Sequence, residues 1–160
     1  MTSWRIDRIR LIGLALRVFL GGAFLYAAWL KLREPWMLFA MAVDAYQLLP
    51  QWAVILVART LPWAELLLGL LLIGGKWIRF TSAAVSALLA GFLAMMAFTY
   101  LKGMQIDCGC FGSGDPISPR TLARDSGLLA AALVLTIMSF RGRAAASPPP
   151  PPDNEPHRGR

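Results

Sequence analysis

The sequence predicts an all-α membrane protein with four transmembrane helices in a bundle and a short interfacial helix after the first span. The 160 residues are 57% hydrophobic and 16% charged, whereas soluble domains average about 45–50% apolar and about 25% charged residues. The mean hydropathy is +0.55, and the apolar residues gather in runs of about 20, the length that a helix needs to cross a bilayer. This composition excludes disorder for most of the chain, and two cysteines are too few for a disulfide-rich secreted scaffold.

Each predicted span is an apolar run bounded by polar residues or by turn-forming residues. The first run is broken by Arg17, and the third contains no charge. The fourth is placed from Ser118-Pro119, because serine is a good N-cap and proline suits the first helical position. The expected spans cover residues 11–32, 52–75, 81–101 and 119–140.

The segments outside the spans have different expected roles. Glu34-Pro35 predicts a helix start and Pro50 a helix end. The segment between them is too short to span, and its aromatic residues favour an interfacial helix at headgroup level, with a re-entrant segment as the alternative. Residues 1–10 form the N-terminus. Residues 141–160 contain the proline run Pro148–Pro152 and predict a disordered or polyproline tail.

The basic residues indicate topology. A net charge of +7 and a pI of 10.3 would suggest nucleic acid in a soluble protein, but here lysine and arginine flank the apolar runs, so no nucleic-acid partner is expected. Because cytoplasmic segments are enriched in lysine and arginine, we expect both termini in the cytoplasm and residues 102–118 outside. The cytoplasmic set is Arg5, Arg8, Arg10, Lys76, Arg79, Arg141, Arg143, Arg158 and Arg160; the smaller outer set is Lys31, Arg33, Lys102 and Arg120.

The third loop, residues 102–118 and here called the cysteine loop, carries the candidate catalytic residues Cys108 and Cys110. Thiols in an oxidising compartment can form a disulfide. A Cys-x-Cys ring is tight, and departures from ideal disulfide geometry make the bond easier to reduce. Gly109 between the cysteines permits the backbone angles that such a ring demands. Labile disulfides pass oxidising equivalents on, so the pair predicts redox chemistry.

Three alternatives for the cysteines stay open. A clamp disulfide gains little from so short a loop, and two unpaired thiols could simply pack in a turn. Two thiolates could instead hold Cu(I), with Met104 as a soft third ligand. They are too few for a tetrahedral zinc site or an iron–sulfur cluster in one chain, so the leading interpretation has neither a metal nor a bound cofactor.

Charged residues inside the spans predict two ion pairs. At 1.5 Å per residue, Arg17 and Glu65 both lie about 10 Å from the inner face, and we expect them to form a structural lock. Arg59 and Asp125 lie at similar depth below the outer face and form the second expected pair. Arg59 and Arg124 are expected to support the site, because positive charge lowers the pKa of a nearby cysteine. The alternative is that the charges line a solute path.

Several short motifs lie in the order of a known family pattern. A lysine precedes the interfacial segment, a proline and a glutamate lie in the second span, and a Cys-Gly-Cys-Phe-Gly loop precedes an arginine-aspartate pair. With these motifs the sequence resembles the DoxX-like superfamily, and most closely its methylamine utilisation MauE branch. The matching residues are Lys31, Leu32, Pro35, Tyr46, Pro50, Pro62, Glu65, Cys108, Gly109, Cys110, Phe111, Gly112, Arg124 and Asp125.

The resemblance implies a four-helix protein of the bacterial inner membrane that helps to mature periplasmic redox proteins. The family is associated with production of the disulfide-rich small subunit of methylamine dehydrogenase, alongside a thioredoxin-like partner. The residues themselves do not point to methylamine.

Together, the residues and the resemblance predict a bilayer-embedded protein that exchanges disulfides with a periplasmic thioredoxin-like protein or a disulfide-containing client. A membrane quinone is a candidate acceptor for the electrons, although no residue in the sequence identifies a quinone site. The alternatives are a non-catalytic assembly or soft-metal-binding subunit, and a small-solute transporter lined by Arg17, Glu65, Arg59 and Asp125.

Overall fold

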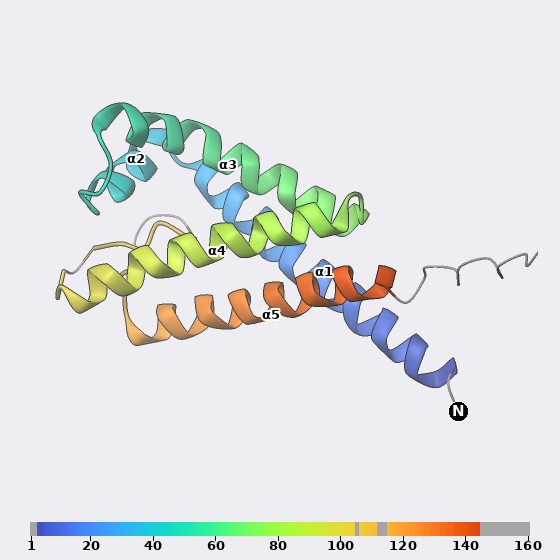
Figure 1. Cartoon of the computed structure of the whole chain (residues 1–160). Helices are drawn as coiled ribbons and strands as arrows, with labels where there is room; N and C mark the ends of the chain where they lie inside the picture. The colour runs from blue at the N-terminus through green and yellow to red at the C-terminus, as the bar shows by residue number, and fades with distance from the viewer. Residues whose placement is uncertain (1–2, 105, 112–114, 145–160) are drawn as a thin grey trace, which may run out of the picture.

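The computed structural model of the chain describes residues 3–104, 106–111 and 115–144, and over these residues it is an all-α protein (Figure 1). The predicted fold class is therefore confirmed. The predicted motif residue Gly112 and residues 145–160 of the predicted tail lie outside the described ranges. The helices are α1 (Ser3–Arg33), α2 (Trp36–Asp44), α3 (Gln51–Gly74), α4 (Ile78–Leu101) and α5 (Pro119–Ala144).

Four of these helices are long and apolar enough to cross a membrane, and many of their large apolar side chains are exposed, as expected for a surface in contact with lipid. The first and last helices extend beyond the predicted spans, because backbone hydrogen bonding continues into polar residues once a helix has formed. Residues 141–144 are therefore helical instead of belonging to the predicted tail. The stretches suited to a membrane are Arg10–Arg33, Gln51–Gly74, Ile78–Leu101 and Pro119–Arg141.

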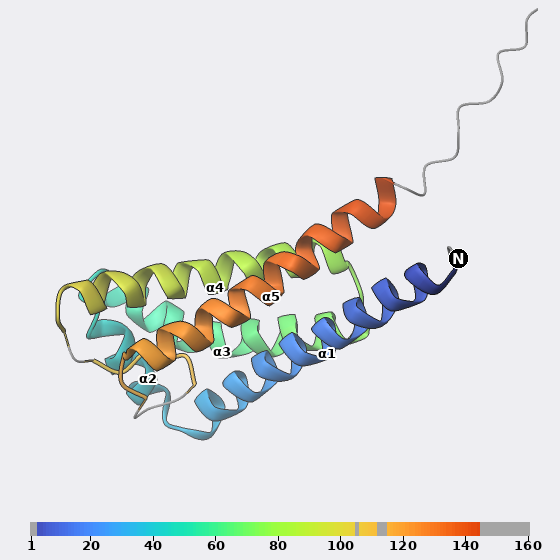
Figure 2. The ribbon, with the colours of Figure 1, turned by 90° about the horizontal axis from the view of Figure 1, so that it is seen from below.

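The long helices are arranged as two closely packed pairs, α1 with α3 and α4 with α5. Figure 2 shows the start of α1 and the end of α5 at one end of the bundle, and α2 with the cysteine loop at the other. Between α4 and α5, Ser86 Oγ lies 3.0 Å from Thr136 Oγ1, a polar contact of the kind that joins helices in membranes. The shared core between the pairs includes Leu20, Leu72, Val85 and Ala132.

Two glycines determine the register of α1 against α3. A Cβ atom on Gly21 would lie 3.0 Å from the carbonyl oxygen of Gly69, and a Cβ on Gly69 would lie 3.0 Å from the carbonyl oxygen of Gly21. The two backbones therefore approach as closely as small residues allow. In this antiparallel register, the last turn of α1 lies beside the middle of α3.

The predicted Arg17–Glu65 pair is wrong, and the register explains why. Arg17 lies opposite the end of α3, where its Nε donates to the carbonyl of Leu72 at 3.0 Å and its Nη2 donates to the carbonyl of Ile73 at 3.1 Å. These carbonyls belong to the last turn of a helix, which carries partial negative charge. The predicted pairing assumed that residues at equal distance from the predicted ends of two helices lie side by side. It could not include the offset between α1 and α3.

The short helix predicted after the first span is present, but it is shorter than the segment Glu34–Pro50. It begins after Pro35 and ends at Asp44, and Gln47 has a φ of 52°, which does not belong to a helix. Phe39 and Val43 of α2 pack against α3. This short helix therefore covers the part of α3 that extends past the end of α1.

Candidate functional site

The cysteine loop is closed at its base by two strand-like contacts. Cys108 N donates to the carbonyl of Asp115 at 2.9 Å, and Ile117 N donates to the carbonyl of Ile106 at 3.0 Å. This antiparallel bridge places Asp115 directly across from Cys108. Thr121 N donates to Ser118 Oγ at 3.3 Å, so α5 begins as the sequence predicted, with serine before Pro119.

Gly109 lets the chain turn sharply between the two cysteines. Its φ is +67°, in the left-handed region that favours glycine. The residue is buried, and a Cβ atom would lie 3.4 Å from Cε2 of Phe39 and 3.5 Å from Cβ of Ala42. The turn therefore depends on glycine for both conformation and space.

The two sulfurs are free thiols in different surroundings. Cys108 is buried, with 2% of its surface exposed, and its Sγ accepts a hydrogen bond from the backbone N–H of Cys110 at 3.4 Å. Arg124 Nη2 lies 3.9 Å from the same sulfur. Cys110 is partly exposed, and its Sγ lies 3.8 Å from Sδ of Met96 on α4.

These surroundings separate the acidities of the two thiols. Hydrogen bonding from the Cys110 thiol, together with the Cys110 N–H and the Arg124 guanidinium, outweighs burial and lowers the pKa of Cys108 to about 7. Cys110 shows the opposite effect, because its hydrogen bond to Cys108 and its burial raise its pKa. Cys108 is therefore the more acidic thiol of the pair, and Cys110 the less acidic one.

Arg124 joins the cysteine loop to α5. Its Nη1 forms an ion pair with Asp115 Oδ2 at 2.7 Å, and its Nε pairs with Asp125 Oδ1 at 3.0 Å. The guanidinium also lies over the ring of Phe111, 4.4 Å from the ring centre. A single side chain thus orients the acidic residues and the ring around Cys108.

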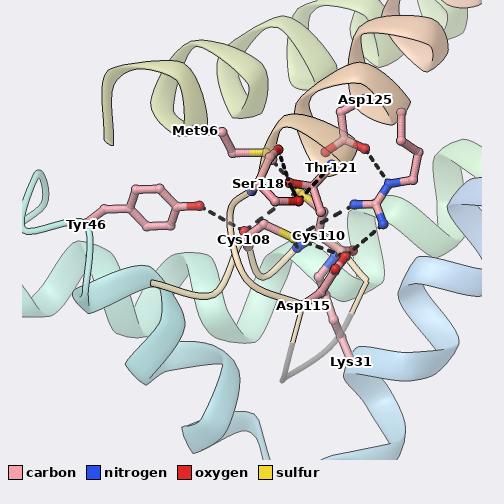
Figure 3. A network of polar contacts seen from close by, with 10 residues as sticks. Lys31, Tyr46, Met96, Cys108, Cys110, Asp115, Ser118, Thr121 and Asp125 are labelled. Carbon is pink, nitrogen blue, oxygen red and sulfur yellow. Dashed lines mark hydrogen bonds and ion pairs between the residues drawn. The ribbon is translucent and has the colours of Figure 1, made fainter. Parts of the chain in front are cut away.

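Two buried side chains hold the backbone carbonyls of both cysteines (Figure 3). Lys31 Nζ, at the end of α1, donates to the carbonyl of Cys110 at 2.7 Å and to Glu65 Oε1 and Oε2 at 2.7 and 2.8 Å. The hydroxyl of Tyr46 donates to the carbonyl of Cys108 at 3.0 Å. Burial raises the pKa of Tyr46, so the phenol stays a donor. The loop is therefore tied to α1, to α3 through Glu65, and to the segment after α2.

The contact between Arg124 and Cys108 predicts a measurable shift in thiol reactivity. In the native protein, alkylation of Cys108 by iodoacetamide should rise with pH through a midpoint near 7, because only the thiolate reacts. Replacing Arg124→Gln should raise the midpoint and slow alkylation at pH 7 about threefold. Mass spectrometry of the labelled peptide measures both effects. Arg124→Lys keeps the charge and is the control; an unchanged profile in Arg124→Gln would show that the guanidinium does not stabilise the thiolate.

The predicted Arg59–Asp125 pair is wrong. Arg59 is exposed on α3 with its guanidinium 4.7 Å from the ring centre of Trp36, and Asp125 pairs with its neighbour Arg124. Counting along the sequence gave the two residues similar depth, but depth does not specify which way a helix face points. Of the two arginines expected to support the site, only Arg124 lies beside Cys108 among the described residues.

The remaining motif residues have mainly architectural positions. Pro50 precedes α3, and its carbonyl accepts a hydrogen bond from Ala53 N at 2.9 Å. Pro62 is buried inside α3. The ring of Phe111 lies 6.2 Å from that of Tyr26. These residues shape the bundle and the loop.

Sequence reasoning missed two residues of the site, Asp115 and Met96. Lys31 was expected as a motif residue and as an outer loop charge, but its contacts with Glu65 and with the Cys110 carbonyl were not predicted. No pattern in the sequence marks Asp115 or Met96 as a neighbour of the cysteines. Met96 also replaces Met104 as the methionine beside the thiols, because Met104 is exposed. Within the described ranges, no cluster of three or more His, Cys, Asp or Glu residues could hold a metal.

The fold and site together define a multi-pass membrane protein with a pair of cysteines held at one end of a four-helix bundle. The family model described as methylamine utilisation protein MauE matches residues 9–138. The chain therefore belongs to the MauE family, as the motifs suggested.

A search of characterised proteins supports the same assignment. The chain is 36% identical over 124 residues to the methylamine utilization protein MauE of Paracoccus denitrificans. The match covers 76% of this chain and 66% of that protein, so this chain spans slightly less than two thirds of its relative's length. No solved structure matches the chain.

Proposed function

We propose that this protein is a dithiol–disulfide exchange centre of the bacterial inner membrane, acting on a periplasmic thioredoxin-like protein or a disulfide-containing client. The observation that carries the proposal is the environment of Cys108. Its sulfur accepts a hydrogen bond from the Cys110 N–H and lies 3.9 Å from Nη2 of Arg124. This environment favours a thiolate near neutral pH, which is the reactive form in disulfide exchange.

The exchange step conserves electrons within the two proteins. A partner thiolate attacks one sulfur of the Cys108–Cys110 disulfide, the S–S bond breaks, and the other sulfur leaves as a thiolate. The second thiol of the partner then gives up its proton and attacks the mixed disulfide. The partner leaves with its own disulfide, and this protein is left with two reduced cysteines.

The membrane orientation and the family support the biological setting. The distribution of lysine and arginine favours an extracytoplasmic cysteine loop, where disulfides persist. The relative in Paracoccus denitrificans is named for methylamine utilization. We propose that this chain likewise supports the maturation of a periplasmic protein of the methylamine dehydrogenase type.

The test is thiol trapping in intact cells with a membrane-impermeant maleimide. The native cysteines should resist the reagent until a reductant is added and should then be labelled completely. In a background with Cys108→Ser and Cys110→Ser, Met104→Cys provides a control in the same exposed loop, and Trp77→Cys provides one at the opposite end. Cysteines that are always reduced and unreachable from outside, or a double serine variant that supports its host fully, would overturn the proposal.

A soft-metal site is the second candidate, because the Cys110 and Met96 sulfurs lie 3.8 Å apart beside Cys108. Two thiolates and a thioether suit Cu(I). The same trapping experiment separates the two functions. A copper site predicts thiols that a Cu(I) chelator, instead of a reductant, makes available to maleimide.

The structure does not support the alternative of a solute path lined by the four charged residues. Arg17 binds the end of α3, and Arg59 is exposed. Glu65 is held by Lys31, and Asp125 is paired with Arg124. The four charged residues therefore do not line one path through the described part of the bundle.

A further inference from the structure

A pocket lies behind the cysteine loop, between the α1–α3 pair and the α4–α5 pair. Its enclosed part has a volume of about 30 Å³, and the empty space including its open mouth is about 440 Å³, so a ligand larger than water would lie partly in the mouth. Its walls are mostly apolar and include Ala27, Leu88, Phe92 and Leu128. Among the described residues the backbones of α1 and α4 do not approach each other closely, so the pocket lies where these two helices are separated.

Three polar residues line this pocket: Glu65, Cys110 and Asp125. Both carboxylate oxygens of Glu65 are held by Lys31. Asp125 is 3% exposed, and its Oδ2 has no hydrogen-bond partner in the described part of the chain. A buried polar atom without a partner is costly, so this oxygen indicates that a hydrogen-bonding ligand belongs in the pocket.

The two cysteines gain electrons when they oxidise a partner, and these electrons must then pass to an acceptor. The chain has two cysteines in total, and both belong to the same loop, so no further thiol can carry electrons across the membrane. The acceptor must therefore reach the pair itself. Cys110 is the sulfur that lines the pocket, and a pocket enclosed by membrane-spanning helices suits an acceptor dissolved in the bilayer.

We propose that this pocket binds the headgroup of a membrane quinone, which reoxidises Cys108 and Cys110; the inference rests on the exchange function proposed above. Two sulfur–hydrogen bonds break and one S–S bond forms. Two electrons and two protons pass to the quinone, whose carbonyl oxygens become hydroxyls. Asp125 Oδ2 can hold one proton in transit, because it accepts a hydrogen bond from the quinol and, once protonated, donates one to the quinone.

The test uses the full chain in lipid nanodiscs, with both cysteines reduced and oxygen excluded. Decylubiquinone and menaquinone-1 are added separately, quinone absorbance is followed, and free thiols are counted. We expect one quinone to be consumed for each pair of thiols lost. Asp125→Asn should slow this reaction about a hundredfold, the low end of what a proton-transferring group contributes. Leu88→Trp, which fills the pocket, should also block it, whereas Leu133→Trp on the exposed face of α5 should not.

A second measurement on the same samples separates this inference from the proposed function. The oxidised protein is mixed with reduced thioredoxin, and disulfide transfer is measured. If transfer occurs but neither quinone oxidises the thiols, or if Leu88→Trp and Leu133→Trp reduce quinone at equal rates, the quinone site is wrong and the exchange function stands. Absence of both reactions in the native protein would overturn the exchange function itself.

Discussion

Replacing Lys31→Met should destabilise the protein by about 3–5 kcal/mol, the usual cost of removing one partner of a buried ion pair. Lys31 and Glu65 have side-chain exposures of 0% and 5%, and the Nζ–Oε1 distance is 2.7 Å. The substitution leaves the Glu65 carboxylate buried without its counter-charge, and it also removes the donor to the Cys110 carbonyl. Unfolding in mixed detergent micelles, followed by circular dichroism, measures the loss.

The double variant Lys31→Met, Glu65→Leu separates the two roles of Lys31. Apolar side chains often replace a buried ion pair without loss of stability, so most of the stability should return. Disulfide exchange should stay slow, because the carbonyl of Cys110 still lacks its donor. Full recovery of exchange in the double variant would show that Lys31 serves only to neutralise Glu65.

A partner thiolate should attack Cys110 in the disulfide form of the site, releasing Cys108, with a preference of about tenfold or more. The thiol of lower pKa is the better leaving group, and the Cys110 N–H and the Arg124 guanidinium, which do not depend on a free Cys110 thiol, lower the pKa of Cys108. Exposure favours the same direction, because Cys110 is partly exposed and Cys108 is buried. The two cysteines therefore have different roles despite the single residue between them.

The measurement uses the oxidised native protein and a thioredoxin variant that retains one cysteine, so that the mixed disulfide cannot resolve. The released thiol is alkylated, and fragment-ion mass spectrometry identifies which cysteine carries the label. We expect the label on Cys108 and thioredoxin on Cys110. An equal distribution, or the reverse, would show that the acidity of Cys108 does not direct the exchange. Omitting thioredoxin controls for label on protein that was already reduced.

The sequence by itself determined the elements and their order. Long apolar runs could only be membrane-spanning helices, since the bilayer leaves backbone groups no other partners. Ser118 and Pro119 identified the start of α5, and the glycine between two cysteines predicted the sharp turn of the cysteine loop. These features depend on neighbours along the chain, and so they can be recognised without knowing how the helices pack.

The tertiary structure alone decided which charges meet. The contact between Gly21 and Gly69 offsets α1 against α3. Because of this offset, Glu65 forms its ion pair with Lys31, and Arg17 binds carbonyls at the end of α3. The closed base of the loop brings Asp115 to Cys108. Depth along a helix can be counted from the sequence. An ion pair, however, forms only when two side chains lie within a few ångströms. That distance depends on the offset and rotation of packed helices, which arise from contacts between residues far apart in the chain.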